Sequence, residues 1–309
     1  MNDTTTTTTI APRQPWRRRW QQARERLAPL FGMNRRNVEL VYAHNERRHY
    51  PLADDKIVCK ELLQAIGVPV APTIAIGRGL FEVDALLDQL REREDFVVKP
   101  ASGSGGDGII VIGKRTEDGW QTPKGRQIAV HELRQHLANI TFGCFSKEME
   151  DRILIEQRIE PHALYHSFWS DGVCDLRVIV LRGRPLLSMV RVPTHRSGGR
   201  ANLHQGGIGV AVDIAKGTTY RALSQGKEVE IHPESGEPLI GRLLPDWETC
   251  LKVALGAASA VPLGYLGVDI CVDHRWGPVI LEINARPGLE IQNICAQTLG
   301  AALAREGLS

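Results

Sequence analysis

Two apolar segments near the C-terminus constrain the fold most strongly, because a connection of only four residues, HRWG, separates them. The segments are GVDICVD, residues 267–273, and PVILEIN, residues 278–284. Apolar runs rich in β-branched residues on both sides of a short turn favour an antiparallel hairpin. We therefore predict two paired strands, and their register decides which side chains face one another.

Polar side chains interrupt this predicted hairpin. Alternation along a strand places Glu282 and Asn284 on one face. A register that pairs Asp273 with Pro278 puts Asp269 directly opposite Glu282, at about 5 Å, where like charges destabilise a strand pair. Carboxylate and amide oxygens suit Mg²⁺, which takes its remaining ligands from water and phosphates. A salt bridge to Arg286 or a solvent-facing strand edge would also explain the pattern.

A glycine-rich segment, SGSGGDG at residues 102–108, lies between two further predicted strands, FVVKP and GIIVIGK. A Rossmann loop would lead into a helix, and a P-loop would continue with Gly-Lys-Ser/Thr, so neither motif fits. A loop between two strands can close over phosphates through its backbone N–H groups, and Lys99 before it would add a positive charge. A solvated surface hairpin is the alternative, but with an acidic metal pair nearby nucleotide binding is the better interpretation.

Several other segments predict local structure. Asp54 or Asp55 can cap a helix that ends at Gly67. The dipeptide Arg182-Gly183 predicts a hairpin between two β-rich runs, and residues 217–241 read as a polar hairpin. Asp246 is expected to cap a helix that runs to about residue 260. Strands and hairpins outnumber regular βαβ units, which indicates an α+β protein.

Seven motifs occur in an order that resembles the ATP-grasp carboxylate–amine ligases, above all the RimK-type branch and its α-L-glutamate ligase-like relatives. They are DDK…LLQAIGVPVAPT, FVVKPASGSGGDGI, ILIEQRI, CDLRVIV, GGRANLHQGG, GVDICVD and LEINARPG, and they cover about residues 52–300. The resemblance implies the ATP-grasp fold, in which two α+β subdomains clasp ATP.

The resemblance also implies site residues in three groups. The ATP-binding group is Lys56, Lys99, Ser102, Gly103, Ser104, Gly105, Gly106, Glu156, Gln157, Ile159 and Asp175. The catalytic group is Arg200 and Asn202 near the transferring phosphate, with Arg177 and Arg286 as candidates for anchoring a substrate carboxylate. The metal group is Asp269, Glu282 and Asn284, for Mg²⁺ or alternatively Mn²⁺. Glu156 and Gln157 both remain candidates for the adenine contact, because the family carboxylate aligns at Gln157.

The N-terminal region differs in composition from the rest. Residues 1–50 hold ten arginines and four acids, a net charge of +6, whereas the remainder holds 28 basic and 32 acidic residues. We predict a disordered tail over 1–15, a basic helical arm over 16–51 in place of the full α/β domain that usually precedes the grasp, and an ATP-grasp domain over 52–309. Within that domain, residues 52–155 would carry the glycine loop and residues 156–309 the metal and substrate site. The arm, through residues 16–36, would suit a polyanionic or membrane-surface partner, or simply be solvated.

The function predicted from these features is an ATP- and Mg²⁺-dependent ligase that joins a carboxylate to an amine through an acyl phosphate, with glutamate or another amino acid as the added group. A non-catalytic ATP-binding regulator or scaffold that docks a polyanionic partner is the alternative. A protein kinase is disfavoured, since no H-R-D or D-F-G triplet follows the glycine loop. Six scattered cysteines without a C-x-x-C pair, and no apolar signal segment at the N-terminus, favour a cytoplasmic protein.

Overall fold

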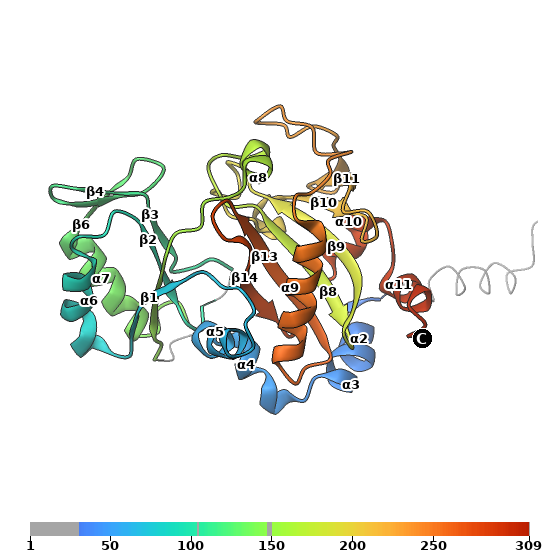
Figure 1. The fold of residues 1–309 in the computed structure, drawn as a ribbon, viewed down its shortest axis with the longest axis horizontal. Coiled ribbons are helices and arrows are strands. Elements are labelled where there is room, and N and C mark those ends of the chain that lie inside the picture. The colour runs from blue at the N-terminus through green and yellow to red at the C-terminus, as the bar shows by residue number, and fades with distance from the viewer. Residues whose placement is uncertain (1–30, 104, 147–149, 309) are drawn as a thin grey trace, which may run out of the picture.

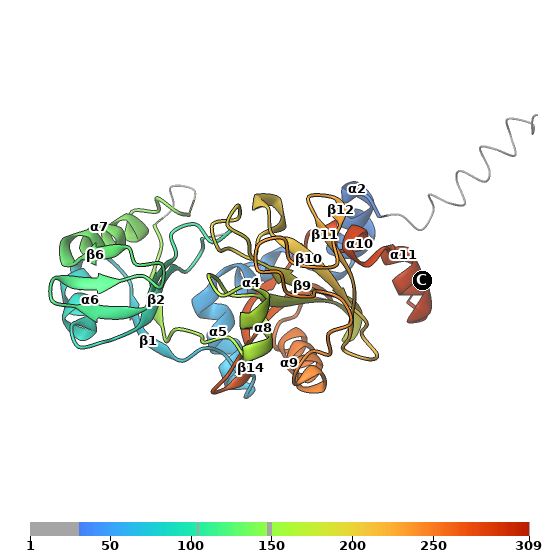
Figure 2. The same ribbon diagram turned by 90° about the horizontal axis from the view of Figure 1, so that it is seen from above.

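The computed structural model describes residues 31–308 apart from residue 104 and residues 147–149. These residues form two bodies that lie side by side, each built on an antiparallel sheet (Figure 1). Figure 2 shows the same two bodies separated along the long axis, with the helices α4, Pro51–Asp54, and α5, Lys56–Ala65, between them. The α+β class predicted from the sequence is confirmed.

The smaller body contains a four-stranded sheet in the order β1-β7-β2-β3 and a three-stranded sheet in the order β4-β5-β6. The strands are β1 Thr73–Gly77, β2 Phe96–Pro100, β3 Ile110–Ile112, β4 Lys114–Thr116, β5 Gly119–Gln121, β6 Gln127–Ala129 and β7 Ile153–Glu156. The helices are the 3₁₀ turn Leu80–Glu82, α6 Val83–Leu90 and α7 Val130–Thr141. The core of this body uses Phe96 and Val98 from β2, and Ile155 from β7. Because side chains alternate along a strand, Lys99 and Glu156 point away from that core.

The larger body is a seven-stranded sheet in the order β12-β11-β10-β9-β8-β13-β14. Its strands are β8 Asp175–Leu181, β9 Arg184–Val192, β10 Ile208–Val212, β11 Thr219–Ser224, β12 Lys227–Glu228, β13 Tyr265–Asp273 and β14 Gly277–Asn284. All nine residues of β13 are buried, so this strand forms the centre of the larger core. Any carboxylate on β13 is therefore removed from water and needs partners within the protein.

The helices of the larger body lie against this sheet. They are α8 Ala163–Phe168, the 3₁₀ turn Leu203–Gln205, α9 Trp247–Ala260, α10 Glu290–Cys295 and α11 Leu299–Arg305. Helix α9 runs along β13 and β14 (Figure 1), and α10 contacts β9 and β10. Asp246 precedes α9 as predicted, but it has φ +52° and its side chain makes no capping hydrogen bond. The prediction that Asp246 caps this helix is thus wrong, although the helix itself is present.

The part of the predicted basic arm that the structure describes is helical and joins the larger body. It comprises α2 Met33–Arg36, a π-helical turn Asn37–Val41, α3 Tyr42–His44 and a 3₁₀ turn Arg47–His49. Arg36 donates a hydrogen bond from Nη1 to the Pro287 carbonyl, at 2.8 Å. Asn45 is buried and bonds both the N–H and the carbonyl of Tyr265. This part of the arm therefore packs into the larger body. The predicted tail and the arm up to residue 30 lie outside the described residues.

Local predictions are otherwise close to the structure. The side chain of Asp55 accepts hydrogen bonds from the N–H groups of Ile57 and Val58, which makes Asp55 the cap of α5. Arg182 and Gly183 both have positive φ, +49° and +73°, as the tight turn between β8 and β9 requires. No helix among the described residues is long and apolar enough to cross a membrane.

Candidate functional site at the cleft between the two sheets

The candidate site lies where α5 and the smaller sheet meet β14 of the larger sheet. A narrow cavity there has five charged side chains in its lining, namely Lys56, Lys60, Lys99, Glu156 and Glu282. The remaining lining residues are apolar or small, namely Ala53, Cys59, Leu63, Val70, Leu154, Ile280 and Leu281. Both predicted phosphate-contacting lysines therefore face one cavity together with one of the predicted metal ligands.

Lys56 stands at the base of the glycine loop. Its backbone N–H donates to the Ala101 carbonyl at 2.9 Å, and its Nζ donates to the Gly103 carbonyl. Burial lowers the pKa of Lys56, and the Glu282 carboxylate only partly offsets this. A buried ammonium beside a loop of backbone amides is suited to receive an anion.

Lys99 and Lys60 share one buried carboxylate, that of Glu156. Lys60 donates a hydrogen bond to Glu156 Oε1, and Lys99 Nζ lies 2.5 Å from Oε2. Burial alone would raise the pKa of Glu156, but Lys99 and Lys60 hold it below its usual range. The structure thus places the Glu156 carboxylate against the two lysines. This side chain is therefore not free for the adenine contact that was one of its two predicted roles.

The glycine loop is fixed at its start and reaches the larger body at its far end. The Ser102 N–H donates to both oxygens of the buried Asp151, at 3.1 and 3.0 Å. Gly106 has φ +80°, and a Cβ there would lie 3.3 Å from Arg200 Cδ. Asp107 pairs with Arg200, Oδ1 to Nη1 at 3.0 Å. Arg200 is therefore adjacent to the loop, as a residue acting on a transferring phosphate needs to be.

The other predicted loop residues are placed less directly. Gly103 and Gly105 lie in the loop with Gly106, whereas Ser104 lies outside the described residues. The Asn202 amide nitrogen lies 4.0 Å from the position that a Cβ on Gly105 would take, and its Oδ1 accepts from the His204 N–H. Asn202 therefore shapes its own turn at the edge of the loop.

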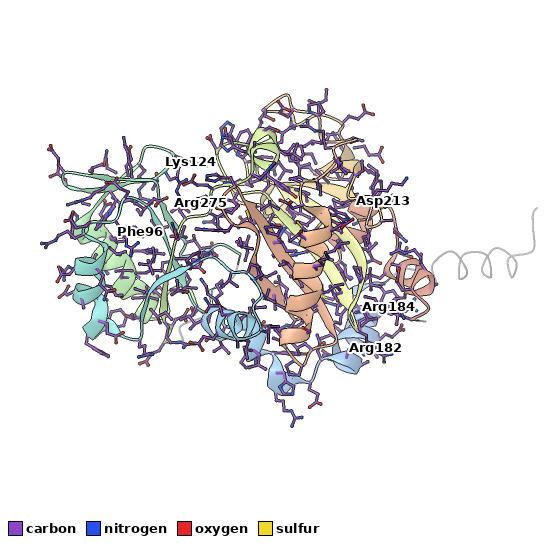
Figure 3. The ribbon with its side chains drawn as sticks, in the orientation of Figure 1. Phe96, Lys124, Arg182, Arg184, Asp213 and Arg275 are labelled. Atoms are coloured by element: carbon purple, nitrogen blue, oxygen red, sulfur yellow. The ribbon has the colours of Figure 1, made fainter. Side chains whose placement is uncertain are left out.

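A second contact across the cleft comes from the turn between β5 and β6. Lys124 Nζ donates to the Gly198 carbonyl at 3.1 Å, and Figure 3 shows Lys124 at the gap between the two bodies. Together with the Asp107–Arg200 pair, this contact joins the smaller body to the loop that carries Arg200. The glycine loop and that loop are thus held close enough to enclose a ligand.

The predicted carboxylate pair is present on β13 and β14. Asp269 pairs directly with Glu282, and Gly267 with Asn284. Asn284 Nδ2 lies 3.2 Å from Asp269 Oδ2 and 3.3 Å from Glu282 Oε1. The prediction that Asp269, Glu282 and Asn284 come together is therefore met by the backbone register and by the side chains.

Two arginines neutralise part of this cluster. Arg177 binds Asp269 through Nε and Nη2, at 2.7 and 2.6 Å. Arg191, on β9, binds Asp175 through Nε and Nη2 and also donates to Asp269 Oδ2 at 2.7 Å. Arg177 is thus occupied by Asp269 rather than presented to a substrate, and Asp175 contacts Arg191 rather than an open nucleotide surface.

The three carboxylates respond differently to this arrangement. Burial alone would raise the pKa of Asp269, but Arg177 and Arg191 hold it well below its usual range. Burial raises the pKa of Asp175 to about 6, with Arg191 opposing and Asp269 adding to the rise. Burial and the Asp269 charge also raise the pKa of Glu282. Three carboxylates face two guanidinium groups, and the Lys56 ammonium also acts on Glu282.

The donor set fits a divalent cation that shares its ligands with a second molecule. The carboxylates of Asp269 and Glu282 are hard oxygen donors of the kind Mg²⁺ prefers. Asn284 directs its amide nitrogen at both of them. Among the described residues, no group of three or more His, Cys, Asp or Glu side chains is arranged to hold a metal ion. A cation here would therefore need ligands from outside the chain, such as phosphate oxygens.

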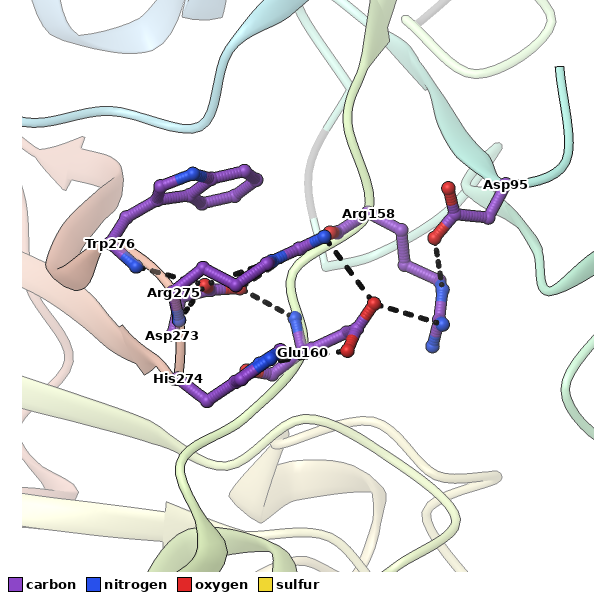
Figure 4. Close-up of polar contacts among 7 residues, drawn as sticks. All are labelled: Asp95, Arg158, Glu160, Asp273, His274, Arg275 and Trp276. Carbon is purple, nitrogen blue, oxygen red and sulfur yellow. Dashed lines mark hydrogen bonds and ion pairs between the residues drawn. The ribbon is translucent and has the colours of Figure 1, made fainter.

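The segment between β7 and α8 crosses from one body to the other. Glu160 donates its N–H to Asp273 Oδ2 at 2.7 Å, and Arg275 Nη2 donates to the Arg158 carbonyl at 2.6 Å. Arg158 also pairs with Asp95 at 3.0 Å (Figure 4). The segment is therefore tied to the smaller sheet at one end and to the β13–β14 turn at the other.

An apolar patch borders this crossing segment. It contains Ile159, and its other members are Ala71, Val173, Cys271, Trp276, Val279 and Leu281. The Gln157 N–H is bonded to the Pro72 carbonyl at 2.9 Å. Ile159 therefore belongs to a small buried apolar cluster beside the crossing segment. Arg286 lies elsewhere, exposed and paired with Asp54 at 2.9 Å.

Two charged residues of the site were missed by sequence reasoning. Lys60 stands four positions after Lys56 on α5 and so shares its face, which is a signal that could have been used. Arg191 could not have been placed so simply. A β-bulge between Ile179 and Val180 shifts the β8–β9 register and brings Arg191 opposite Asp175.

Two sheets that clasp one charged cleft define this chain as an ATP-grasp protein. The model of the sugar-transfer associated ATP-grasp family matches residues 35–304, and the chain belongs to that family.

Curated relatives are similar over most of this chain. A probable alpha-L-glutamate ligase of Maridesulfovibrio salexigens is 26% identical over 251 residues, which are 81% of this chain and 61% of the relative. The ribosomal protein bS6–L-glutamate ligase of Escherichia coli is 23% identical over 249 residues, again 81% of this chain and 61% of the relative. The chain thus spans about three fifths of the length of these relatives.

Solved structures with a similar fold include two ATP complexes. The D-alanine–D-alanine ligase of Bacillus anthracis with ATP is 18% identical, with 83% of this chain and 61% of the other covered and a TM-score of 0.43. The biotin carboxylase of Campylobacter jejuni is 17% identical, with 84% and 47% covered and a TM-score of 0.49.

Proposed function

We propose that this protein is an ATP-dependent ligase that joins a carboxylate to an amine, with ADP and phosphate as products. The observation that carries the proposal is that Lys56, Lys99 and Glu282 face one cavity. Lys56 is bonded there to the glycine loop, and Glu282 is paired with Asp269. In this proposal residues 52–155 form the subdomain with the glycine loop, and residues 156–309 form the subdomain with the metal and substrate site. The relatives named as glutamate ligases suggest glutamate, or another amino acid, as the added group.

The cleft offers separate surfaces for the parts of ATP. Lys56, Lys99 and the N–H groups of the glycine loop after Ser102 would bind the phosphates, while the Ser102 N–H anchors the loop to Asp151. The segment from Glu156 to Ile159 would receive the adenine ring, with the Gln157 N–H already bonded to the Pro72 carbonyl. Asp269, Glu282 and Asn284 would hold Mg²⁺, or Mn²⁺ in its place. Such an ion neutralises charge on the phosphates when it is bound.

The described site provides positioning and charge stabilisation. Phosphoryl transfer depends mainly on these two effects. Arg200, beside the glycine loop, would stabilise charge on the group in transfer, and Asn202 would support its turn. We propose that the acceptor is a substrate carboxylate, which becomes an acyl phosphate, and that an amine then displaces phosphate to form the amide. Arg177 would act through Asp269, and the exposed Arg286 would have to leave Asp54 to anchor a substrate carboxylate.

Interception of the acyl phosphate tests the proposal. With ATP, Mg²⁺ and the correct acid but no amine, hydroxylamine should yield a hydroxamate in proportion to the ADP formed. An ADP-release screen over amino acids and short peptides finds the acid. Formation of AMP and pyrophosphate would mean adenylation and would contradict the mechanism. ATP binding without any substrate-driven turnover would instead favour the non-catalytic regulator.

Five of the six cysteines are buried thiols, which suits the cytoplasmic location proposed for this chain.

The basic N-terminal region supports a second proposal. We propose that residues 16–36 bind an anionic membrane surface, because the sequence there is rich in arginine and exposed apolar side chains occur within this range and just after it. Met33, Val38 and Tyr42 are 67%, 62% and 68% exposed, and residues 16–30 contain five arginines and one acid. Apolar and basic side chains on one surface are typical of segments that lie at a membrane interface.

Vesicle binding tests the membrane proposal. Deletion of residues 1–30 should abolish sedimentation with vesicles that contain phosphatidylserine, and should leave ATP turnover unchanged. Val38→Ser with Tyr42→Ser should weaken binding, and added salt should weaken it further, because exposed charges are screened. Equal binding of the full chain to neutral and anionic vesicles, or none to either, would contradict the proposal. Preferential binding to RNA under the same conditions would point to a different polyanion.

A further inference from the structure

Lys60 has no role in the proposed chemistry, yet it is among the most buried charged residues of the protein. Its side chain is 7% exposed, and it reaches Glu156 from the middle of α5. Lys99 reaches the same carboxylate from β2 and is 15% exposed. One buried carboxylate thus has two buried lysines, of which only Lys99 adjoins the glycine loop.

We propose that Lys60 is a positioning residue that keeps Glu156 neutralised, so that Lys99 can turn from Glu156 to a phosphate of ATP. The inference rests on the proposed function, in which Lys99 binds phosphate. Lys60 itself does not touch the nucleotide.

The charges of the group support this division of roles. Glu156 and Lys60 balance one another, so the departure of Lys99 leaves a neutral pair behind. Without Lys60, the same departure would leave a buried carboxylate unpaired, which is strongly unfavourable. Lys99 would then remain on Glu156, and ATP would have to compete with an internal anion for it.

The geometry indicates which lysine leaves. Lys60 makes a hydrogen bond to Oε1, whereas Oε2, beside Lys99, is buried without an aligned hydrogen bond. Glu156 is held in place because β7 pairs with β1 at Thr73 and with β2 at Val97. Lys60 is anchored on a ten-residue helix, so the carboxylate and Lys60 form the fixed part of the group.

The other charged groups that face this cavity are Lys56 and Glu282. Lys56 is directed to the Gly103 carbonyl, and Glu282 is bonded to Asn284. Neither of these contacts supplies Glu156 with a replacement for Lys60. The ion pairs between Glu156 and its two lysines are therefore the contacts that ATP binding has to change.

A rescue experiment separates this role from a structural one. Lys60→Met should raise the Kd for ATP by roughly 30-fold or more, the size expected when one partner of a buried charge pair is lost. The Kd for adenosine should change little, because adenosine needs no lysine. Lys60→Met combined with Glu156→Gln should recover most of the ATP affinity, since no carboxylate then holds Lys99. Lys60→Arg, which keeps the charge, serves as the matched control and should bind ATP within a few-fold of the unaltered protein.

Calorimetric titrations of the full chain with ATP and adenosine measure these constants. An unchanged Kd for ATP in a folded Lys60→Met variant would overturn the proposal, as would failure of the double variant to recover affinity. If Lys60→Met does not fold, the Kd for ATP of the double variant is compared with that of Lys60→Arg. A much weaker Kd in the double variant would contradict the proposed release of Lys99. Failure of the unaltered protein to bind ATP would refute the proposed function itself, a different outcome.

Discussion

Glu282→Gln is expected to lower Mg²⁺-dependent ATP turnover by about 100-fold or more while the protein stays folded, since even residues that only support a metal ligand cost about 10- to 100-fold when mutated. Glutamine keeps the shape of the side chain but removes a charge that a cation would use. The fold should tolerate the change, because burial and Asp269 already raise the pKa of Glu282. Turnover measured across a range of Mg²⁺ concentrations, together with the melting temperature, tests this expectation.

Asp269→Asn provides the contrast. Asp269 is the shared partner of Arg177 and Arg191, and all three side chains are largely buried. Removal of its charge leaves the Arg177 guanidinium without its carboxylate partner, whereas Arg191 keeps Asp175. Breaking a buried charge pair in this way costs about 3–5 kcal/mol. Asp269→Asn should therefore lose both turnover and thermal stability, whereas Glu282→Gln loses turnover alone. A folded Glu282→Gln variant with normal turnover would exclude this pair as the metal site.

The placement of Asp269 opposite Glu282 followed from the sequence, although the assumed register is wrong at the turn. Asp273 pairs with Gly277 rather than Pro278, so the strands leave the turn one residue out of the predicted register. A β-bulge between Asp269 and Ile270 then restores the predicted pairing beyond it. Bulges insert a residue in response to local twist and packing. Alternation in a sequence reveals which residues share a face, but it does not reveal where a bulge falls.

Residues that act through tertiary contacts were harder to predict. The glycine loop and Lys99 were recognised because strand, loop and lysine are consecutive in the sequence. The resemblance left Glu156 and Gln157 both open as the adenine contact. In the structure the Glu156 carboxylate lies between two lysines from different elements, α5 and β2. Such a contact depends on how α5 packs against the smaller sheet, and no local pattern encodes it.

The N-terminal region shows the same limit. Its positive charge suggested an independent arm, yet Arg36 and Asn45 are buried and bond backbone groups near the end of β14 and the start of β13. Composition describes the average of a segment, whereas integration into a fold depends on a few side chains. Phe31, Leu40, Val41 and Tyr50 supply that integration by entering the core of the larger body.

Arg200→Ala is expected to reduce hydroxamate formation by about 100- to 1000-fold, the loss seen when one preorganised donor is removed from a site of developing charge. The Kd for ATP should change far less. Arg200 Nη1 is bonded to Asp107, which leaves other N–H groups of the guanidinium for a phosphoryl group in transfer. The pair itself is exposed, at 45% and 66%, so it adds little to stability and the variant should fold normally.

Lys124→Ala is the matched control for Arg200→Ala. This variant also removes a contact between the two bodies, the hydrogen bond to the Gly198 carbonyl. Unlike Arg200, however, Lys124 is not paired with any residue of the glycine loop that the structure describes. If closure of the cleft were all that Arg200 provides, both variants should lose activity to a similar extent. If Arg200 stabilises charge during transfer, Lys124→Ala should retain most hydroxamate formation, and Arg200→Lys should recover only part of it because an ammonium lacks the planar array of donors. A large rise in the Kd for ATP in Arg200→Ala, equal to its loss of rate, would instead assign this arginine to ground-state binding.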